Sequence, residues 1–192
     1  MPNWCYTSYV VTGDQEELDD LYSKMQSLEN SPESLVPNDF GPTWLGNLVT
    51  LFKGDWKKIK CRGYWTFLDR SDYIHFETET AWVDMRETFD FIESKYDTIK
   101  FYYQSEEPGC EYYVTNDLNG DFFPERYCFT PNLHQDTYLY MSDEEDEFLK
   151  DVSKTIGVEV CSLEEAKEEV YNYNKNKNYN DSAHIIIYEI VN

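Results

Sequence analysis

The stretch HFETETAW, residues 75–82, alternates between two kinds of side chain. Its even-numbered positions carry aromatic and threonine side chains, and its odd-numbered positions carry His75, Glu77, Glu79 and Ala81. Successive side chains of a strand point to opposite faces of the sheet. This period of two therefore predicts a strand with one dry face and one wet face, and it places both glutamates on the wet face.

The run before it, YWTFLDR, is separated from this strand by Ser71-Asp72, which predicts a β-hairpin with a two-residue loop. In that register Phe67 faces Phe76 on the dry side. On the wet side Tyr64 faces Glu79, so the two glutamates lie beside a tyrosine.

The first half of the chain reads as strand, helix, strand, strand, helix, strand. The expected elements are a strand at 4–12, a helix from Asp14 with Glu17 in its capping box, the hairpin at 64–82, a helix at 84–96 and a strand at 98–104. This order predicts an α+β fold, a ferredoxin-like βαββαβ sandwich with both helices on one sheet face. The glutamates then lie on the open face.

Three further segments complete the expected organisation. Residues 31–63 read as a helical insertion broken at Gly46 and Gly54, and Asn119-Gly120 predicts an added hairpin at about 110–130. We therefore expect a first domain at 1–133. A C-terminal annex at 134–192 would pack on it, with a strand at 137–141, helices at 142–157 and 162–173, and a closing strand at 184–191.

The composition is strongly acidic. The 192 residues include 38 Asp and Glu against 16 Lys and Arg, giving a net charge of −22, and the first 133 residues contribute −13 of it. Nucleic-acid binding needs cations that displace counterions from phosphates, so this field opposes direct binding of nucleic acid and favours a basic partner. An acidic surface that only confers solubility is the alternative.

Cysteine usage and the start of the chain indicate a compartment. The five cysteines are odd in number and form no C-x-x-C pair, which argues against a disulfide framework or a zinc ribbon. MPNWCYTSY has neither a basic nor an apolar signal region, and no apolar run approaches about 18 residues. We expect a cytoplasmic protein that does not enter a membrane.

The glutamates are the first candidate site. At two residues of strand rise, Glu77 and Glu79 lie about 6.6–6.8 Å apart, a spacing that a carboxylate hydrolase can use with Tyr64 and Tyr102 nearby. Acid–base catalysis also needs one desolvated carboxylate, and nothing else in the sequence assembles around this pair. Glu106 and Glu107 extend the acidic surface.

Two further possibilities involve a metal ion or a small ligand. His75, Glu77 and Glu79 follow one extended strand and cannot converge on an ion, so we expect no metal and no cofactor. Trp44 and Trp82 could line a ligand-stacking pocket, although packing in the core is the ordinary role of such side chains.

One segment of this acidic chain is basic, and we call it the basic stripe. It combines Trp56 with Lys53, Lys57, Lys58, Lys60 and Arg62. It could contact nucleic acid, or it could be the face of an amphipathic helix paired with surrounding acids.

Several stretches resemble one family. MPNWCYTSYVVTG at the start, ETETAW after the hairpin and EEPG before a tyrosine-rich run are similar to the YubB-type ferredoxin-like domain proteins of plasmids and phages. The resemblance covers about residues 1–130 and implies the same fold and a mobile-element origin. It carries over no catalytic residue, and Tyr6-Thr7 departs from the polar residue and Asn that the family often has.

These observations favour a non-enzymatic acidic interaction protein. Its expected partner is a host or phage protein with a basic surface, which it could inhibit, for instance as a DNA mimic. The alternatives are a nucleic-acid accessory protein that uses the basic stripe, and a small-ligand binder or weak hydrolase that uses Glu77 and Glu79.

Overall fold

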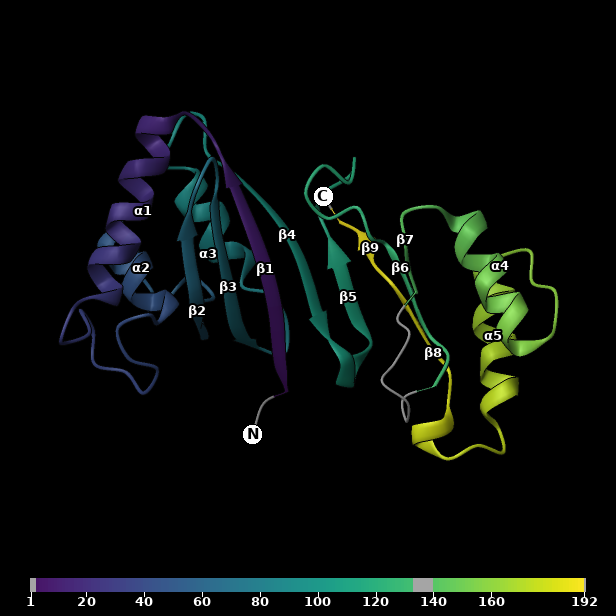
Figure 1. The fold of residues 1–192 in the computed structure, drawn as a ribbon. Helices are drawn as coiled ribbons and strands as arrows, with labels where there is room; N and C mark the ends of the chain where they lie inside the picture. Colours follow the sequence, from purple (N-terminus) through teal and green to yellow (C-terminus); the bar gives the residue numbers. More distant parts are fainter. Residues whose placement is uncertain (1–2, 133–139, 192) are drawn as a thin grey trace. The chain divides into compact units, whose positions relative to one another are not determined.

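The structure, a computed structural model, describes residues 3–132 and 140–191 (Figure 1). The chain divides into two compact units, Met1–Asn116 with Val191–Asn192, and Asp117–Ile190. The described part holds five α-helices and antiparallel strands, so the expectation of a mixed α+β protein is confirmed. Among the described residues no helix combines the length and apolarity needed to span a membrane.

The first unit contains the predicted succession of elements with two additions, α2 and β5. Its elements are β1 (Trp4–Thr12), α1 (Gln15–Glu29), α2 (Leu45–Leu51), β2 (Gly63–Arg70), β3 (Ile74–Ala81), α3 (Arg86–Glu93), β4 (Lys100–Glu107), the 3-10 turn η1 (Pro108–Cys110) and β5 (Tyr112–Thr115). The five strands form an antiparallel sheet in the order β2-β3-β1-β4-β5.

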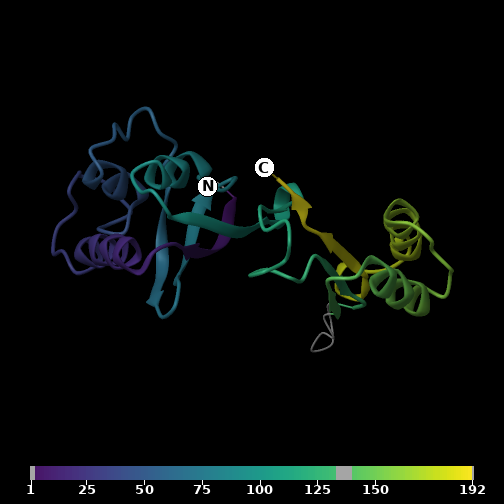
Figure 2. The same ribbon diagram turned by 90° about the horizontal axis from the view of Figure 1, so that it is seen from above.

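The three helices cover one face of this sheet, which we call the covered face; the opposite face is the open face (Figure 2). The alternation in residues 75–82 explains the division, since Phe76 and Thr78 are buried on the covered face and Glu77 is exposed on the other. The helix α1 adds an apolar stripe of Leu18, Leu21, Met25 and Leu28, all buried.

The predicted capping box of α1 is wrong. Asp14 is the N-cap residue but makes no side-chain capping bond. The Glu17 carboxylate instead accepts hydrogen bonds from the backbone N–H groups of Asp97 and Thr98 and from the Thr98 hydroxyl. This acidic residue therefore fixes the loop that leads into β4 rather than the start of its own helix.

The central hairpin has the predicted register at one end only. Tyr64 faces Glu79 as expected, but the register shifts at a bulge between Trp65 and Phe67. The predicted two-residue loop is also wrong, because Arg70 pairs with Ile74 and three residues, 71–73, join the strands. An extra residue in one strand moves every later side chain to the other face. Phe67 therefore faces Glu77 on the open face and is 49% exposed, and Leu68 takes the expected place opposite Phe76.

The insertion at 31–63 also differs from its prediction. Its one helix is α2, and Gly46 lies inside that helix instead of breaking it. A side chain at position 46 would collide with the Trp44 ring, so glycine is required there. The residues that follow Leu51 form turns, so the basic stripe does not follow a helix face.

The predicted hairpin at 110–130 does not form. The strand β5 pairs with β4, whereas β6 (Tyr127–Thr130) pairs with strands of the second unit. Gly120 has the positive φ expected of an Asn-Gly turn. The Asp117 carboxylate holds the segment in place, because it accepts hydrogen bonds from the backbone N–H groups of Asp121, Phe122 and Phe123. The predicted boundary at 133/134 lies outside the described residues, and the observed division falls after Asn116.

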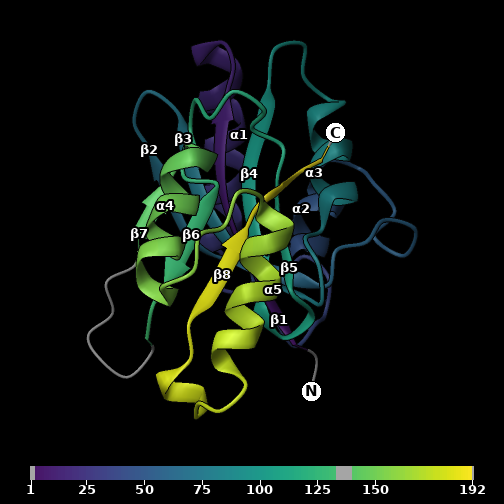
Figure 3. The same cartoon turned by 90° about the vertical axis from the view of Figure 1, so that its right-hand side faces the viewer.

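The second unit has its own core. Besides β6 it contains β7 (Tyr140–Ser142), α4 (Glu145–Ile156), α5 (Leu163–Asn174), the 3-10 turn η2 (Tyr179–Asp181), β8 (His184–Ile187) and β9 (Glu189–Ile190). The strands β7-β6-β8 form a sheet, and two helices pack on it (Figure 3). The helix α4 contributes Phe148 and Val152 to the core, and α5 contributes Ala166 and Val170. Both predicted helices are confirmed. The predicted closing strand is divided at Tyr188 into β8 and β9, and residues 137–139 of the predicted first strand lie outside the described residues.

Candidate functional site

A row of alternating tyrosines and carboxylates crosses the open face of the first unit. The antiparallel registers place its members side by side on one sheet face, in the order Tyr64, Glu79, Tyr6, Glu106, Tyr113. Neighbouring strands lie about 4.8 Å apart, so the two glutamates flank Tyr6 at about 9.6 Å from each other. We call this set the tyrosine–glutamate row. Tyr6 is 48% exposed at its centre, and the other members are half-buried.

One hydrogen bond organises the β2 end of the row. The Tyr64 hydroxyl donates to Glu79 Oε2 at 2.7 Å, and this bond to a carboxylate raises the pKa of Tyr64 to about 12. The bond holds both side chains in one orientation. It leaves the other oxygen of the Glu79 carboxylate as an acceptor site.

The other predicted acidic residues fall on two faces. Glu77 is exposed on the open face, opposite Phe67 and Ser8, and Tyr102 lies two positions before Gln104 on the same face of β4. Glu107 points to the covered face and is buried, where hydrogen bonds from the Cys110 thiol and the Gly109 backbone N–H lower its pKa. Only Glu106 of the pair extends the open-face surface.

The two tryptophans predicted to form a pocket do not share one. Trp44 is buried beside Trp56, with ring centroids 5.2 Å apart, and belongs to the main core. Trp82 is exposed just after β3, where its backbone has a φ of +74°, and its N–H donates to the Asn3 carbonyl. Trp44 therefore packs in the core, which is the ordinary role of such a side chain.

The basic stripe is exposed and partly paired. Lys58 contacts Asp55 at 3.5 Å, and Lys60 contacts Glu87 at 2.7 Å. The ammonium of Lys57 lies 5.5 Å from the centroid of the Trp56 ring. Exposed ion pairs of this kind contribute little to stability, so the lysines retain freedom to move.

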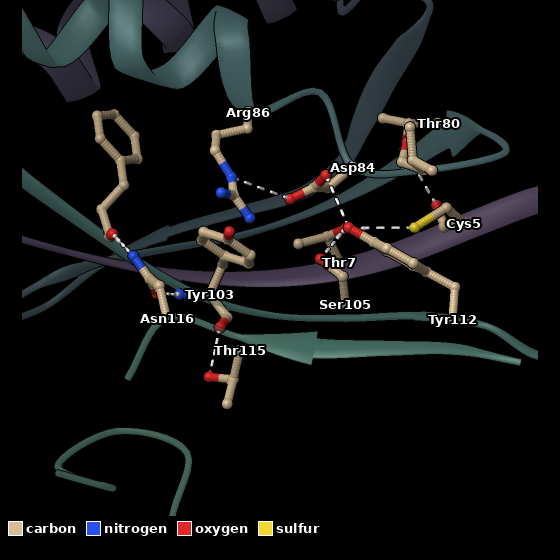
Figure 4. Close-up of polar contacts among 12 residues, drawn as sticks. Cys5, Thr7, Thr80, Asp84, Arg86, Tyr103, Ser105, Tyr112, Thr115 and Asn116 are labelled. Atoms are coloured by element: carbon tan, nitrogen blue, oxygen red, sulfur yellow. Dashed lines mark hydrogen bonds and ion pairs between the residues drawn. The ribbon is translucent and has the colours of Figure 1, made fainter. Parts of the chain in front are cut away.

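A second polar group of residues lies on the covered face, centred on the buried carboxylate of Asp84 (Figure 4). Asp84 belongs to the segment between β3 and α3. The Tyr112 hydroxyl donates to its Oδ1 at 3.0 Å, and Arg86 Nε lies 3.9 Å from its Oδ2. The Arg86 guanidinium also lies over the Tyr103 ring, 5.4 Å from its centroid.

Short hydroxyl and thiol contacts continue this group across the strands. Thr7 Oγ1 and Ser105 Oγ are 2.9 Å apart, and Cys5 Sγ lies 3.9 Å from Thr7 Oγ1 (Figure 4). These side chains are buried on the covered face, where Thr78 and Thr80 of β3 lie opposite Thr7 and Cys5. Buried polar groups need partners, and these residues supply partners for one another.

Burial sets the protonation of this group. Desolvation is the main cause that raises the pKa of Asp84, and it also raises the pKa values of Tyr103 and Tyr112 above their usual range. It raises the pKa of the Cys5 thiol to about 11. A nucleophilic cysteine needs a lowered pKa, so Cys5 is not activated for covalent catalysis.

The sequence pattern predicts the open-face residues but not the covered-face group. Glu79 and Tyr64 stand in a recognisable alternation, whereas Asp84, Arg86, Tyr103 and Tyr112 follow no shared spacing. The single available signal was an aspartate at the first position of the helix predicted at 84–96, with an arginine two residues later. Topology alone brings that pair to β4 and β5.

Within the described ranges, no group of three or more His, Cys, Asp and Glu side chains is arranged to hold a metal ion.

A scan against models of protein families matches nothing in this chain, and searches of curated proteins and of solved structures return no match either.

Proposed function

We propose that this chain is a non-enzymatic acidic interaction protein whose open sheet face binds a basic segment of a partner protein. The observation that carries the proposal is the tyrosine–glutamate row. Carboxylates make charge-assisted hydrogen bonds to Lys and Arg, and tyrosine rings attract the same cations through their faces. A surface that alternates the two suits an extended strand or a helix rich in Lys and Arg.

The surroundings of the row support the same partner. Glu77 and the exposed Asp69 lie on the open face beside the row, and the whole chain carries a net charge of −22. A field of one sign speeds the encounter with a partner of the opposite sign, and local contacts then decide which partner stays. Tyrosine is also one of the residues enriched at protein interfaces.

The fold and the origin of the protein are part of this proposal. The antiparallel order β2-β3-β1-β4, with α1 and α3 on one face, supports a ferredoxin-like βαββαβ unit extended by β5. The opening and hairpin motifs support membership of the YubB-type proteins of plasmids and phages. In that setting the basic partner is a host or phage protein of nucleic-acid binding or defence, and a cytoplasmic location suits the five free cysteines.

A peptide-binding experiment tests the proposed surface. The probe is a synthetic peptide of alternating Lys, Arg and Ala residues, and its binding is followed by fluorescence anisotropy at physiological salt. Neutralising the open face with Glu77→Gln and Glu79→Gln should raise the Kd about tenfold, equivalent to about 1.4 kcal/mol. Tyr6→Ala should weaken binding to a similar degree because it removes the exposed ring at the centre of the row.

A matched control separates this surface from the bulk charge. Glu29→Gln with Glu33→Gln removes the same two charges from exposed positions at the end of α1 and in the loop after it. This control should raise the Kd by less than about twofold. Equal losses in the two double variants would mean that only the net charge binds the peptide, which would overturn the proposal.

The basic stripe provides a competing function that the same assay can detect. Single-stranded and duplex DNA should not bind at physiological salt, because the field of the chain repels phosphates. Saturable binding of DNA that is abolished by Lys57→Glu with Lys58→Glu would instead favour a nucleic-acid accessory protein.

A further inference from the structure

A cavity of about 400 Å³ lies in the first unit, between α3 and one edge of β4. Its volume falls in the range of small-molecule sites. Arg86, Asp90 and Glu93 of α3 line one side, and residues 100–103 of β4 line the other. No member of the tyrosine–glutamate row lines the cavity, so it is separate from the surface proposed to bind a partner.

The cavity exists because β5 is short. β5 pairs only with residues 104–107 of β4, so the earlier part of that edge has no strand beside it. The Asn116 side chain satisfies the backbone there, because it accepts from the Tyr103 N–H and donates to the Phe101 carbonyl, both at 2.8 Å (Figure 4). The edge therefore needs no further strand, and the space beside it stays open.

Part of the wall is aromatic. Phe89 and Phe101 line the cavity, with ring centroids 5.3 Å apart, and the Tyr103 ring lies 5.4 Å from the Arg86 guanidinium. Aromatic rings bind the apolar body of a ligand and attract cations through their faces. This part of the wall therefore suits a flat apolar group.

The charged side chains leave one carboxylate unpaired. Lys100 pairs with Glu93, and Arg86 Nε lies 3.9 Å from Asp84 Oδ2. Asp90 lines the cavity and forms neither an ion pair nor a side-chain hydrogen bond with any residue in the described part of the chain. Two cations thus neutralise two of three carboxylates, and the charge of Asp90 remains.

Asp90 is reached from solvent but is also partly desolvated. Its side chain is exposed, yet desolvation raises its pKa, and the positive charge of Arg86 offsets this effect only in part. A carboxylate that has lost some hydration and has no counterion is stabilised by a cation placed beside it. An anion at the same position would be repelled.

We propose that this cavity binds a small organic cation, namely a primary amine with a flat apolar body. The ammonium group donates to the Asp90 carboxylate, and the body packs against Phe89 and Phe101. Arg86 stays beside Asp84 and Lys100 stays beside Glu93, so binding breaks no existing ion pair.

The test compares three probes of similar size on the full-length chain by ligand-observed NMR and calorimetry at pH 7. The probes are benzylamine, which is a cation, benzyl alcohol, which is uncharged, and benzoate, which is an anion. Benzylamine should bind saturably with a Kd of about 1 mM, and the other two probes should bind at least about fivefold more weakly.

A single substitution locates the ammonium. Asp90→Asn keeps the size of the side chain, removes its charge and should weaken benzylamine binding by about tenfold, to the level of benzyl alcohol. The variant should fold, because it removes no ion pair and no side-chain hydrogen bond. Asp39→Asn, at an exposed loop position outside the cavity, is the matched control and should leave the Kd within about twofold.

Chemical-shift mapping on the wild-type chain locates the body of the ligand without any substitution. The ring signals of Phe101 and the side-chain amide of Asn116 should shift saturably with benzylamine, because both residues line the cavity. The ring signals of Tyr6, on the open face, should stay unchanged.

Three results would overturn the proposal: no saturable binding of benzylamine, a Kd that Asp90→Asn does not alter, or binding of benzyl alcohol or benzoate as tight as that of benzylamine. The peptide-binding function is tested independently, because Asp90→Asn should leave the Kd of the basic peptide within about twofold. Failure of either function therefore leaves the other intact.

Discussion

The two faces of the first unit's sheet contain the same chemical pair in different surroundings. On the open face, the Tyr64 hydroxyl donates to Glu79 at 2.7 Å; on the covered face, the Tyr112 hydroxyl donates to Asp84 at 3.0 Å. The main cause that raises the pKa of Tyr64 is its hydrogen bond to Glu79, whereas for Tyr112 it is desolvation. Burial, and not residue type, distinguishes the two pairs.

This difference assigns the faces to different tasks. The half-exposed groups of the open face can exchange water for a basic partner at small cost, because their charges are already solvated in the free protein. The covered-face groups have left water on folding, so they are sensitive to any change of partner or charge. The open face therefore suits the binding of a macromolecular partner, and the covered face suits the packing of the core.

The largest expected difference between the faces concerns packing. Phe76→Ala removes a buried ring from the covered face and should lower the free energy of unfolding of the first unit by about 3–5 kcal/mol. Phe67→Ala removes a half-exposed ring from the open face and should lower it by less than about 1 kcal/mol. Urea unfolding followed by tryptophan fluorescence measures this directly, because all five tryptophans lie in the first unit. Similar losses in the two variants would contradict the assignment of the faces.

The two tyrosine–carboxylate pairs should differ in the same direction. Tyr112→Phe leaves a buried oxygen of Asp84 without its donor and should cost about 1–3 kcal/mol. Tyr64→Phe leaves Glu79 half-exposed, where water replaces the lost donor, and should cost less than about 1 kcal/mol. The same urea experiment compares the two variants. A larger loss of unfolding free energy in Tyr64→Phe than in Tyr112→Phe would contradict the prediction.

The pH dependence of stability tests the burial of Asp84 alone. Because desolvation raises its pKa in the folded state, the unfolded chain loses this proton first, and the group's contribution to stability falls as the pH rises from 3.8 through the folded-state pKa. Asp84→Asn removes this loss, so its free energy of unfolding relative to wild type should increase between pH 3 and pH 7. Asp39→Asn, at an exposed loop position, controls for the loss of one charge. A relative stability that declines over this range would be the opposite of what burial requires.

The smallest expected effect is a change of titration on the open face. Glu79→Gln removes the carboxylate that holds the Tyr64 proton, so the pKa of Tyr64 should move from about 12 toward 10. Ultraviolet absorbance titration of wild type, Glu79→Gln and Tyr64→Phe isolates this transition. No change in the titration of the Glu79→Gln protein would show that the hydrogen bond is absent in solution.

The sequence predicted the elements that carry a clear period. Alternation in residues 75–82 placed β3 and its two faces, and a helical stripe placed α1. The bulge before Phe67 was not predictable, because its neighbours Trp65 and Phe76 fit an unbroken hairpin equally well. Asn119-Gly120 correctly predicted a turn. It could not show that the Asp117 carboxylate binds the backbone of the following residues, or that β6 pairs with β7 and β8 instead of β5.

The candidate sites divide in the same way. Tyr64 and Glu79 were predicted as neighbours because a hairpin register links them. Asp84, Arg86 and Tyr103 come together through the path of the chain between β3 and β4. Desolvation, which marks that group, is a property of the folded state and leaves no spacing in the sequence.

NMR mapping of the basic peptide on the chain tests the central claim most directly. Backbone amide and side-chain signals of the isotope-labelled protein are followed during titration with the peptide described above. Binding at the open face predicts that the perturbed residues surround Tyr6, Glu77 and Glu79, while Tyr9 and Phe76 of the covered face stay unchanged. Perturbations spread evenly over the acidic surface, or centred away from the tyrosine–glutamate row, would contradict it.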